Sequence, residues 1–236
     1  MLTPPEIARS LLAAGESKAR LPFGKMLLLA ILAGAYIALA GVGATAAAVT
    51  VESGSLAKLL SACVFPAGLS MVILAGSELF TGNCLMVMAL LERRITPAQL
   101  LRNWLTVYLG NAMGGAAVAA LAVYSHTASL FGDGLARSMV SIAESKAALG
   151  AGDAFLRGVL CNFLVCLAVW MAAASKRAEG KVIALFFPIL LFVLCGYEHC
   201  IANLYYLPAG AFAAAEYGME TTLTLAGCLK NLAAVT

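Results

Sequence analysis

The stretch Gly76-Ser-Glu78-Leu-Phe-Thr-Gly-Asn83 returns, in altered form, as Gly196-Tyr-Glu198-His-Cys-Ile-Ala-Asn203 further along the chain. Both stretches follow the pattern Gly-x-Glu-x-x-x-small-Asn, and both lie within long apolar runs. A helix-breaking glycine, a carboxylate and an amide are costly at membrane depth unless they line a pathway. Their duplication predicts a transport protein built from two related halves.

The composition indicates an integral membrane protein. Hydrophobic residues make up 62% of the 236 residues and charged residues only 11%, and the mean hydropathy is +0.94. A soluble globule of this composition would expose too much apolar surface. The apolar runs are continuous rather than alternating, so we expect an all-α membrane fold and not an outer-membrane barrel.

Five membrane spans are expected from the lengths of the apolar runs. The second span is expected to break near Gly76 to Gly82, and the fifth near Gly196 to Asn203, so that Asn83 and Asn203 belong to the breaks. The predicted spans are 26–49, 59–91, 103–125, 155–175 and 182–214.

Residues 1–25 are expected to form an amphipathic helix that lies on the membrane surface, with a gating role as the alternative. Thr3-Pro4-Pro5-Glu6 offers a capping box with proline in the first turn, and Ile7, Leu11 and Leu12 share one face.

The basic residues are distributed unevenly between the two expected sides of the membrane. Ten of the fifteen lie on the side of the N-terminus, which predicts a cytoplasmic N-terminus and a multi-pass protein of the cytoplasmic (inner) membrane. The net charge of +3 is too small and too scattered to suggest nucleic acid as a partner. The ten residues are Arg9, Lys18, Arg20, Lys25, Arg93, Arg94, Arg102, Lys176, Arg177 and Lys181.

The chain is expected to form a single transmembrane domain made of two inverted repeats. Residues 26–125 form the first three-span repeat, 126–153 a polar outer loop with a short helix at 135–149, and 154–236 the second repeat. An odd number of spans inverts the second copy and sets the two breaks against each other. The second copy stops where its sixth span should start, so the repeat predicts that the natural protein continues.

The pair Glu198-His199 is the strongest candidate for chemistry, because burying either group in charged form costs several kcal/mol unless it is compensated. In the alternative interpretation Glu198 ties down freed backbone donors while His199 fills a polar core position. Glu78 has Leu79 where Glu198 has His199. This asymmetry indicates a shared structural task for the glutamates and a special one for His199.

The break at residues 79–83 supplies a hydroxyl and unpaired backbone N–H groups, which suit a small anion. No Asn-Pro-Ala triplet, the signature of water channels, is present. The seven cysteines show no Cys-x-x-Cys spacing and only two histidines accompany them, so we expect no metal and no cofactor.

Three stretches in this order closely resemble the formate/nitrite transporter family, whose members also include hydrosulfide channels. They are Gly76–Asn83, Cys161-Asn-Phe-Leu-Val-Cys-Leu-Ala-Val-Trp170 and Gly196–Asn203. The resemblance runs from the N-terminal helix to the end of the chain. It implies six-span protomers with two interrupted helices, an aquaporin-like fold, and a homopentamer in which each protomer has its own pore.

The resemblance also implies roles for individual residues. His199 matches the central histidine, Thr81 the threonine of the first interrupted helix, Asn162 the pore asparagine of the fourth span, and Lys146 the lysine of the outer vestibule. The apolar constrictions correspond to Phe65, Leu69, Leu79, Phe80, Val165 and Phe192.

The predicted function is a channel or proton-coupled transporter for small monovalent anions, with formate ahead of nitrite and hydrosulfide. An anion gathered near Lys146 would pass the apolar constrictions as the neutral acid after protonation near His199, with His199 either donating the proton or only orienting the ligand. One alternative is a pore for neutral solutes such as water or glycerol. A membrane-embedded enzyme is the weaker one, because no second base or cofactor motif accompanies Glu198 and His199.

Overall fold

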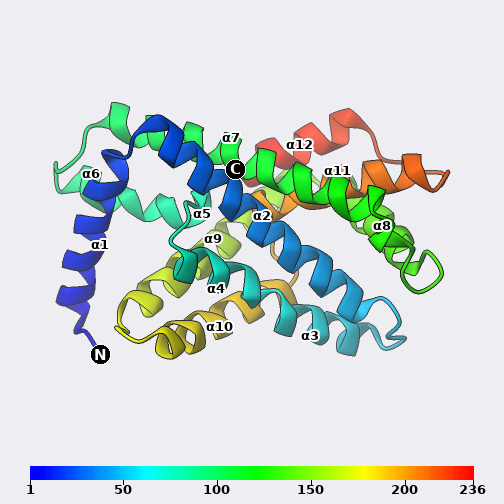
Figure 1. The fold of residues 1–236 in the computed structure, drawn as a ribbon, viewed down its shortest axis with the longest axis horizontal. Helices are drawn as coiled ribbons and strands as arrows, with labels where there is room; N and C mark the ends of the chain where they lie inside the picture. The colour runs from blue at the N-terminus through cyan, green and yellow to red at the C-terminus, as the bar shows by residue number, and fades with distance from the viewer.

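The computed structural model describes residues 1–236, which form only helices and connecting segments (Figure 1). The expectation of an all-α chain is therefore confirmed. The α-helices are α1 (Pro4–Ala19), α2 (Phe23–Ala48), α3 (Gly54–Val64), α4 (Pro66–Ala75), α5 (Phe80–Asn83), α6 (Val87–Leu91), α7 (Pro97–Tyr124), α8 (Gly134–Ala148), α9 (Ala151–Ala173), α10 (Ala178–Leu194), α11 (Cys200–Glu216) and α12 (Leu225–Val235). Two 3₁₀ turns, η1 (Cys84–Met86) and η2 (Thr127–Ser129), complete the set.

Four helical stretches are long and apolar enough to cross a bilayer: Phe23–Ala48, Gly54–Ala75, Pro97–Tyr124 and Ala151–Ala173. The second stretch is α3 and α4 together, with Phe65 as the shared cap before Pro66. Four of the five expected spans overlap these stretches, and the second continues past Gly76 into α5, η1 and α6. The fifth, 182–214, corresponds to α10 and α11, which are not among the four. The helices begin up to about two turns before the uncharged runs. Capping and charged residues are compatible with a helix end at the membrane interface, and a count of apolar residues leaves them out.

Both expected interruptions are present, but they are shorter than the sequence suggested. The first separates α4 from α5 and begins at Gly76 with φ of 74°; the second separates α10 from α11 and contains Gly196 with φ of 70°. Gly82 and Asn83 belong to α5 and Asn203 belongs to α11, so their assignment to the breaks was wrong. Only the left-handed residues require glycine, whereas the others fit the first turn of the new helix.

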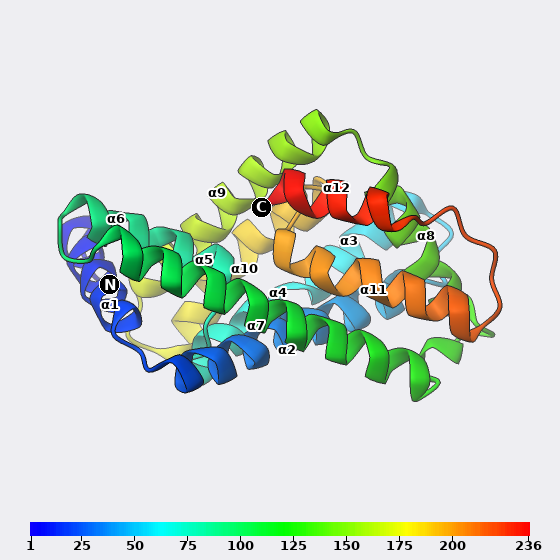
Figure 2. The ribbon, with the colours of Figure 1, turned by 90° about the horizontal axis from the view of Figure 1, so that it is seen from above.

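α1 and α8 lie at opposite ends of the long axis, and the interrupted helices lie between them (Figures 1 and 2). The capping box of α1 is confirmed, because the N–H and hydroxyl groups of Thr3 both donate to Oε2 of Glu6 at 2.7 Å. These bonds hold the pKa of Glu6 below its usual value. The helix at 134–148 agrees with the one expected at 135–149.

α2 and α7 cross at very short distance because glycines face the opposing backbone. A Cβ atom on Gly34 would lie 2.1 Å from the carbonyl oxygen of Asn111, and one on Gly114 would lie 2.0 Å from that of Ile31. The glycine-rich segment of α7 therefore serves packing inside the protomer. This contact holds α7 against α2 and so positions the polar side chains of α7 described below.

Candidate functional site

The two interrupted helices meet at Thr81 and His199. The hydroxyl oxygen of Thr81, in the first turn of α5, lies 3.3 Å from Nε2 of His199, the residue that precedes α11. Both side chains are buried, with 3% and 4% of their surface exposed. The structure thus brings together two residues that are 118 positions apart in the sequence.

His199 caps the N-terminus of α11. Its Nδ1 atom accepts the hydrogen bond of the Ala202 backbone N–H at 3.1 Å. The ring of Phe192 stacks on the imidazole with a centroid distance of 5.6 Å. The ring of His199 is therefore fixed by a backbone donor on one edge, by Thr81 on the other, and by an aromatic face.

Seven apolar side chains gather beside His199. They enclose a cavity of only about 10 Å³, close to the least space that a single water molecule needs. A hydrated anion does not fit. The lining is Ile37, Phe65, Leu69, Leu79, Val165, Ile189, Phe192 and His199, which includes five of the six residues expected at the constrictions.

Two larger cavities reach this centre from opposite directions. One, of about 570 Å³, ends at Phe65, Phe192 and His199, and we call it the Lys146-side cavity because Lys146 also lines it. The other, of about 380 Å³, ends at Leu69 and Leu79; it is the Lys18-side cavity. Since each shares residues with the central cavity, the three form a series with its narrowest point at His199.

Phe80, the sixth expected constriction residue, packs against the apolar cluster that holds the other five but does not line the cavity of about 10 Å³. Its ring packs edge-on against Trp104 and Tyr108, with centroid distances of 6.1 and 5.3 Å. It borders a side cavity of about 150 Å³ that Thr81, Asn162 and His199 also line. Oδ1 of Asn162 is buried there without a hydrogen-bond partner in the protein, so it is available to a donor.

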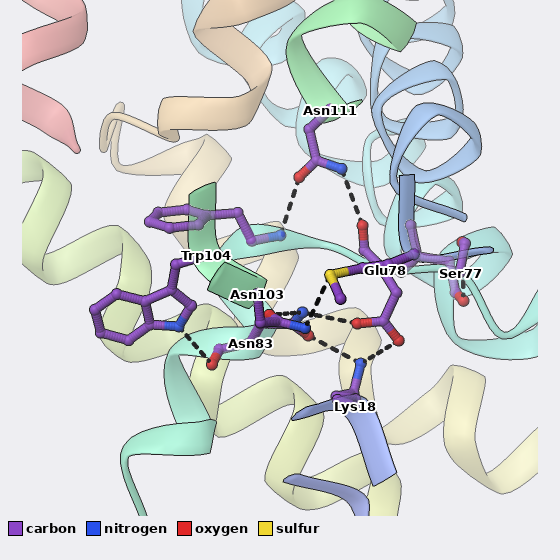
Figure 3. A network of polar contacts seen from close by, with 10 residues as sticks. Lys18, Ser77, Glu78, Asn83, Asn103, Trp104 and Asn111 are labelled. Atoms are coloured by element: carbon purple, nitrogen blue, oxygen red, sulfur yellow. Dashed lines mark hydrogen bonds and ion pairs between the residues drawn. The ribbon is translucent and has the colours of Figure 1, made fainter. Parts of the chain in front are cut away.

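The first interruption is held by a polar network that includes α1 (Figure 3). Nζ of Lys18 donates to Oε1 of Glu78 at 2.8 Å and to Oδ1 of Asn83 at 2.9 Å. Nδ2 of Asn83 in turn donates to Oε2 of Glu78 at 2.7 Å and to Oδ1 of Asn103 in α7 at 2.9 Å. The buried carboxylate thereby has both a cation and an amide as partners.

The second interruption carries a matching network. Nζ of Lys146 in α8 lies 3.0 Å from both carboxylate oxygens of Glu198. Nδ2 of Asn203 donates to Oε2 of Glu198 at 2.7 Å and to Oδ1 of Asn231 in α12, also at 2.7 Å. Each half thus combines a lysine from a flanking helix, the motif glutamate, the motif asparagine and a second asparagine.

Asn111 fastens the first break to its surroundings (Figure 3). Its Nδ2 donates to the carbonyl oxygens of Ala30 and Glu78 at 2.8 and 2.9 Å, while its Oδ1 accepts the N–H of Phe80 at 3.0 Å. The carbonyl of Glu78 lies in the extended segment between α4 and α5, and the N–H of Phe80 lies in the first turn of α5, so neither group has a partner within a helix. Asn111 provides a partner for both.

Sequence reasoning assigned no role to Lys18, Asn103, Asn111 or Asn231. Lys18 was counted only as a charge on the side of the N-terminus, and the asparagines only as part of apolar spans. One signal in the sequence could have linked two of them to the motifs: Asn103 follows Asn83 by 20 residues, and Asn231 follows Asn203 by 28 residues. The structure contains no group of three or more histidine, cysteine, aspartate or glutamate residues that could hold a metal ion.

The fold and the site define a class, that of helical membrane proteins with a narrow path at the meeting point of two interrupted helices. The family model described as "Formate/nitrite transporter" matches residues 5–236. The chain belongs to this family, which confirms the resemblance found in the sequence. It is accordingly a transport protein and not an enzyme.

Several relatives and solved structures are similar to the chain. A probable formate transporter of Methanothermobacter thermautotrophicus is 38% identical over 229 residues, with 89% of this chain and 83% of the relative covered. The formate channel FocA of Escherichia coli strain K12 is 34% identical over 224 residues, with 92% and 78% covered.

Two solved structures share the fold. The first, an FNT family ion channel, has a TM-score of 0.87 and 30% identity, with 98% of this chain and 91% of that chain covered. The second, a pentameric formate channel with formate bound, has a TM-score of 0.80 and 30% identity, with 90% and 89% covered.

Proposed function

We propose that the protein moves a small monovalent anion, formate ahead of nitrite and hydrosulfide, across a membrane together with one proton. The observation that carries the proposal is the series of cavities that narrows to about 10 Å³ between apolar side chains at His199. Moving an ion of carboxylate size into such surroundings costs on the order of 20 kcal/mol by idealised solvation estimates. A neutral acid avoids most of this cost.

Hydrogen-bonding groups beside the constriction suit the protonated acid. A carboxylic acid presents one donor, its O–H group, and one good acceptor, its carbonyl oxygen. Oδ1 of Asn162 has no partner in the protein and can accept the O–H, whereas the hydroxyl hydrogen of Thr81 can be donated to the carbonyl. A carboxylate anion has no hydrogen to offer Asn162.

The capping bond of His199 favours the version in which this residue orients the ligand and does not supply the proton. Because Nδ1 accepts the Ala202 N–H, the proton of the neutral ring is assigned to Nε2. A second proton would have to sit on Nδ1 and would displace the cap of α11. We infer that the proton comes from water in the larger cavities and travels on the acid.

We further propose that the two halves are inverted copies, 26–125 and 154–236, with an aquaporin-like arrangement. Matched contacts support this. The N–H of Glu78 donates to the carbonyl of Leu29 in α2 at 3.2 Å, and that of Glu198 donates to Arg157 in α9 at 3.3 Å. By this correspondence α2 pairs with α9, and α12 pairs with the start of α7.

The assembly and location are proposed from the relatives. The likeness to a pentameric formate channel supports a homopentamer with one pore in each protomer. Large apolar side chains stay exposed on the membrane-spanning helices, as on α7 at Leu101, Leu105, Leu109 and Leu121, where lipid or another protomer can cover them. The distribution of basic residues supports a cytoplasmic N-terminus in the inner membrane.

The test is uptake by proteoliposomes that contain wild-type protein or His199→Ala, with formate, nitrite, hydrosulfide and glycerol offered between pH 4 and 8. We expect one anion to enter fast, with uptake that rises as the pH falls, and no swelling with glycerol. We expect His199→Ala to change the pH profile or the selectivity. Fast glycerol entry would favour the neutral-solute pore, and no flux of any anion through folded oligomers would refute the proposal.

A further inference from the structure

The two large cavities differ in their charge. The Lys18-side cavity is lined by one cation, Lys18, and one carboxylate, Glu78, which are paired at 2.8 Å. The Lys146-side cavity is lined by Lys58, Arg137 and Lys146 and by no carboxylate. An anion therefore meets an uncompensated positive field on one side of the constriction only.

Lys146 contributes little to that field. Both oxygens of Glu198 lie 3.0 Å from its Nζ atom, and its side chain is only 15% exposed. Its Nζ also lies 5.4 Å from the ring centre of Tyr206. A paired lysine presents a dipole to the cavity, and the field of a dipole falls off faster than that of a free charge. With these partners, Lys146 fixes the position of Glu198 and of the start of α11.

Lys58 and Arg137 are the cations that lack a carboxylate partner. Lys58, in α3, makes no hydrogen bond or ion pair, and Arg137, in α8, donates only to the carbonyl oxygen of Gly132. Both are exposed, whereas the residues at the other end of the cavity, Phe65, Phe192 and His199, are buried. The free charges thus stand at the mouth.

Hydroxyl groups accompany these two cations. Ser61 lies one turn after Lys58 on α3, and Ser138 and Ser141 follow Arg137 on α8, and all three line the same cavity. Lysine and arginine with serine hydroxyls supply the charge and the donors that a small carboxylate or oxyanion accepts.

We propose that Lys58 and Arg137, and not Lys146, form the docking site where a small monovalent carboxylate is concentrated before it enters the constriction. This inference rests on the proposed function, which it deepens by assigning the capture step to named residues on one side. Coulomb attraction at about 6 Å in a water-filled cavity corresponds to a roughly threefold enrichment for each free charge.

The experiment measures the formate concentration at half-maximal uptake into proteoliposomes for wild type, Lys58→Gln, Arg137→Gln and the double variant. Lys58→Arg keeps the charge, and Lys230→Gln removes a lysine that does not line the cavity. We expect a rise of about threefold for each single variant and about tenfold for the double variant. Both controls should stay within a factor of 1.5 of wild type, and maximal uptake should be unchanged.

Salt provides an independent check. Because exposed charges are screened over a Debye length of about 10 Å at 0.1 M, added sodium chloride should raise the half-saturation concentration of wild type. It should hardly affect the double variant. A folded Lys146→Gln protein should show a lower maximal uptake or a lower thermal stability, while its half-saturation concentration should stay unchanged.

A readout that needs no flux separates this inference from the proposed function. Line broadening of ¹³C-formate by the detergent-solubilised oligomer should be reduced in the double variant and retained in Lys230→Gln. Equal broadening, or an unchanged half-saturation concentration in the double variant, would overturn the docking site. Absence of anion flux in the wild type would refute the proposed function, while the broadening would still decide whether Lys58 and Arg137 bind the anion.

Discussion

Nε2 of His199 lies 3.3 Å from the hydroxyl oxygen of Thr81, at the point where the two interrupted helices meet. The other ring nitrogen accepts a backbone N–H, so the imidazole is held between a donor and a hydroxyl. This arrangement leads to a prediction about the state of the ring. Nδ1 should be unprotonated and Nε2 protonated throughout the working pH range.

The prediction can be checked by ¹⁵N NMR of the protein labelled at histidine, reconstituted in lipid and examined from pH 5 to 8. His126, the only other histidine, can be removed by His126→Gln. One nitrogen with the shift of an unprotonated ring atom and one with that of an N–H group are expected at every pH. Signals of the doubly protonated ring near pH 6 would contradict the assigned role.

The ion pairs at the two interruptions should differ in their contribution to stability. The side chain of Lys146 is 15% exposed and that of Lys18 is 29% exposed, while their glutamates are 8% and 6% exposed. Removing one partner of a buried pair leaves an uncompensated charge, which costs about 3–5 kcal/mol. We expect Lys146→Gln to reduce stability by about this much and Lys18→Gln by less, because the side chain of Lys18 is the more exposed of the two lysines and water can take its place more easily.

Thermal unfolding in detergent measures the effects of Lys146→Gln and Lys18→Gln. The control is a cycle of Lys146→Gln, Glu198→Gln and the double variant. Since neither charge remains in the double variant, its loss of stability should be smaller than the sum of the losses in Lys146→Gln and Glu198→Gln by about 1–3 kcal/mol. A loss equal to that sum would show that the pair makes no specific contribution.

Gly114→Ala should disrupt the crossing of α2 and α7. The new methyl group would lie 2.0 Å from the carbonyl oxygen of Ile31, so the two helices would have to separate. We expect a loss of stability of roughly 1–3 kcal/mol, seen as a lower melting temperature of the purified oligomer. Gly24→Ala is the matched control, because no atom lies within 4 Å of its added Cβ. An unchanged melting temperature for Gly114→Ala would show that the helices give way without cost.

Glu144 links α8 to the segment before α12, and this link should weaken in acid. Oε1 of Glu144 accepts hydrogen bonds from the backbone N–H of Thr222 at 2.7 Å and from the Thr221 hydroxyl at 2.9 Å. These bonds, the backbone one foremost, hold the pKa of Glu144 below its usual value. A lowered carboxyl pKa means that the stabilisation is present at neutral pH and is lost as the pH falls through the folded-state pKa.

Hydrogen exchange of the Thr222 amide measures this link. Protection at pH 7, corrected for the intrinsic rate, should fall near pH 3 in wild type. In Glu144→Ala it should be low at both values. Protection that is equal at both pH values in wild type would rule out the carboxylate as the anchor of this segment.

The family, the helical membrane fold and the central residues could be predicted from the sequence because each leaves a local signal. Continuous apolar runs indicated the spans, and glycine within such a run indicated each interruption. Glu198 beside His199 marked the centre, since two ionisable groups at membrane depth need a reason to be there. These features depend on residue type and spacing along the chain.

The partners of the two glutamates were decided only by the tertiary structure. Lys18 is 60 residues from Glu78 and Lys146 is 52 residues from Glu198, and no periodicity relates them. The resemblance implied that Lys146 is the lysine of the outer vestibule. In the fold Lys146 pairs with the carboxylate of Glu198, whereas Lys58 and Arg137 have no carboxylate partner. Nearby opposite charges reduce the field of a charged side chain, and the tertiary packing decides which charges lie nearby.

The chain by itself thus determined which residues lie at membrane depth, because hydrophobic transfer free energy depends on composition over a window of about 20 residues. Only the tertiary structure decided which polar groups meet there. Hydrogen bonds and ion pairs act over about 3 Å. Only the folded chain brings residues that are far apart in the sequence, such as Thr81 and His199, within this distance.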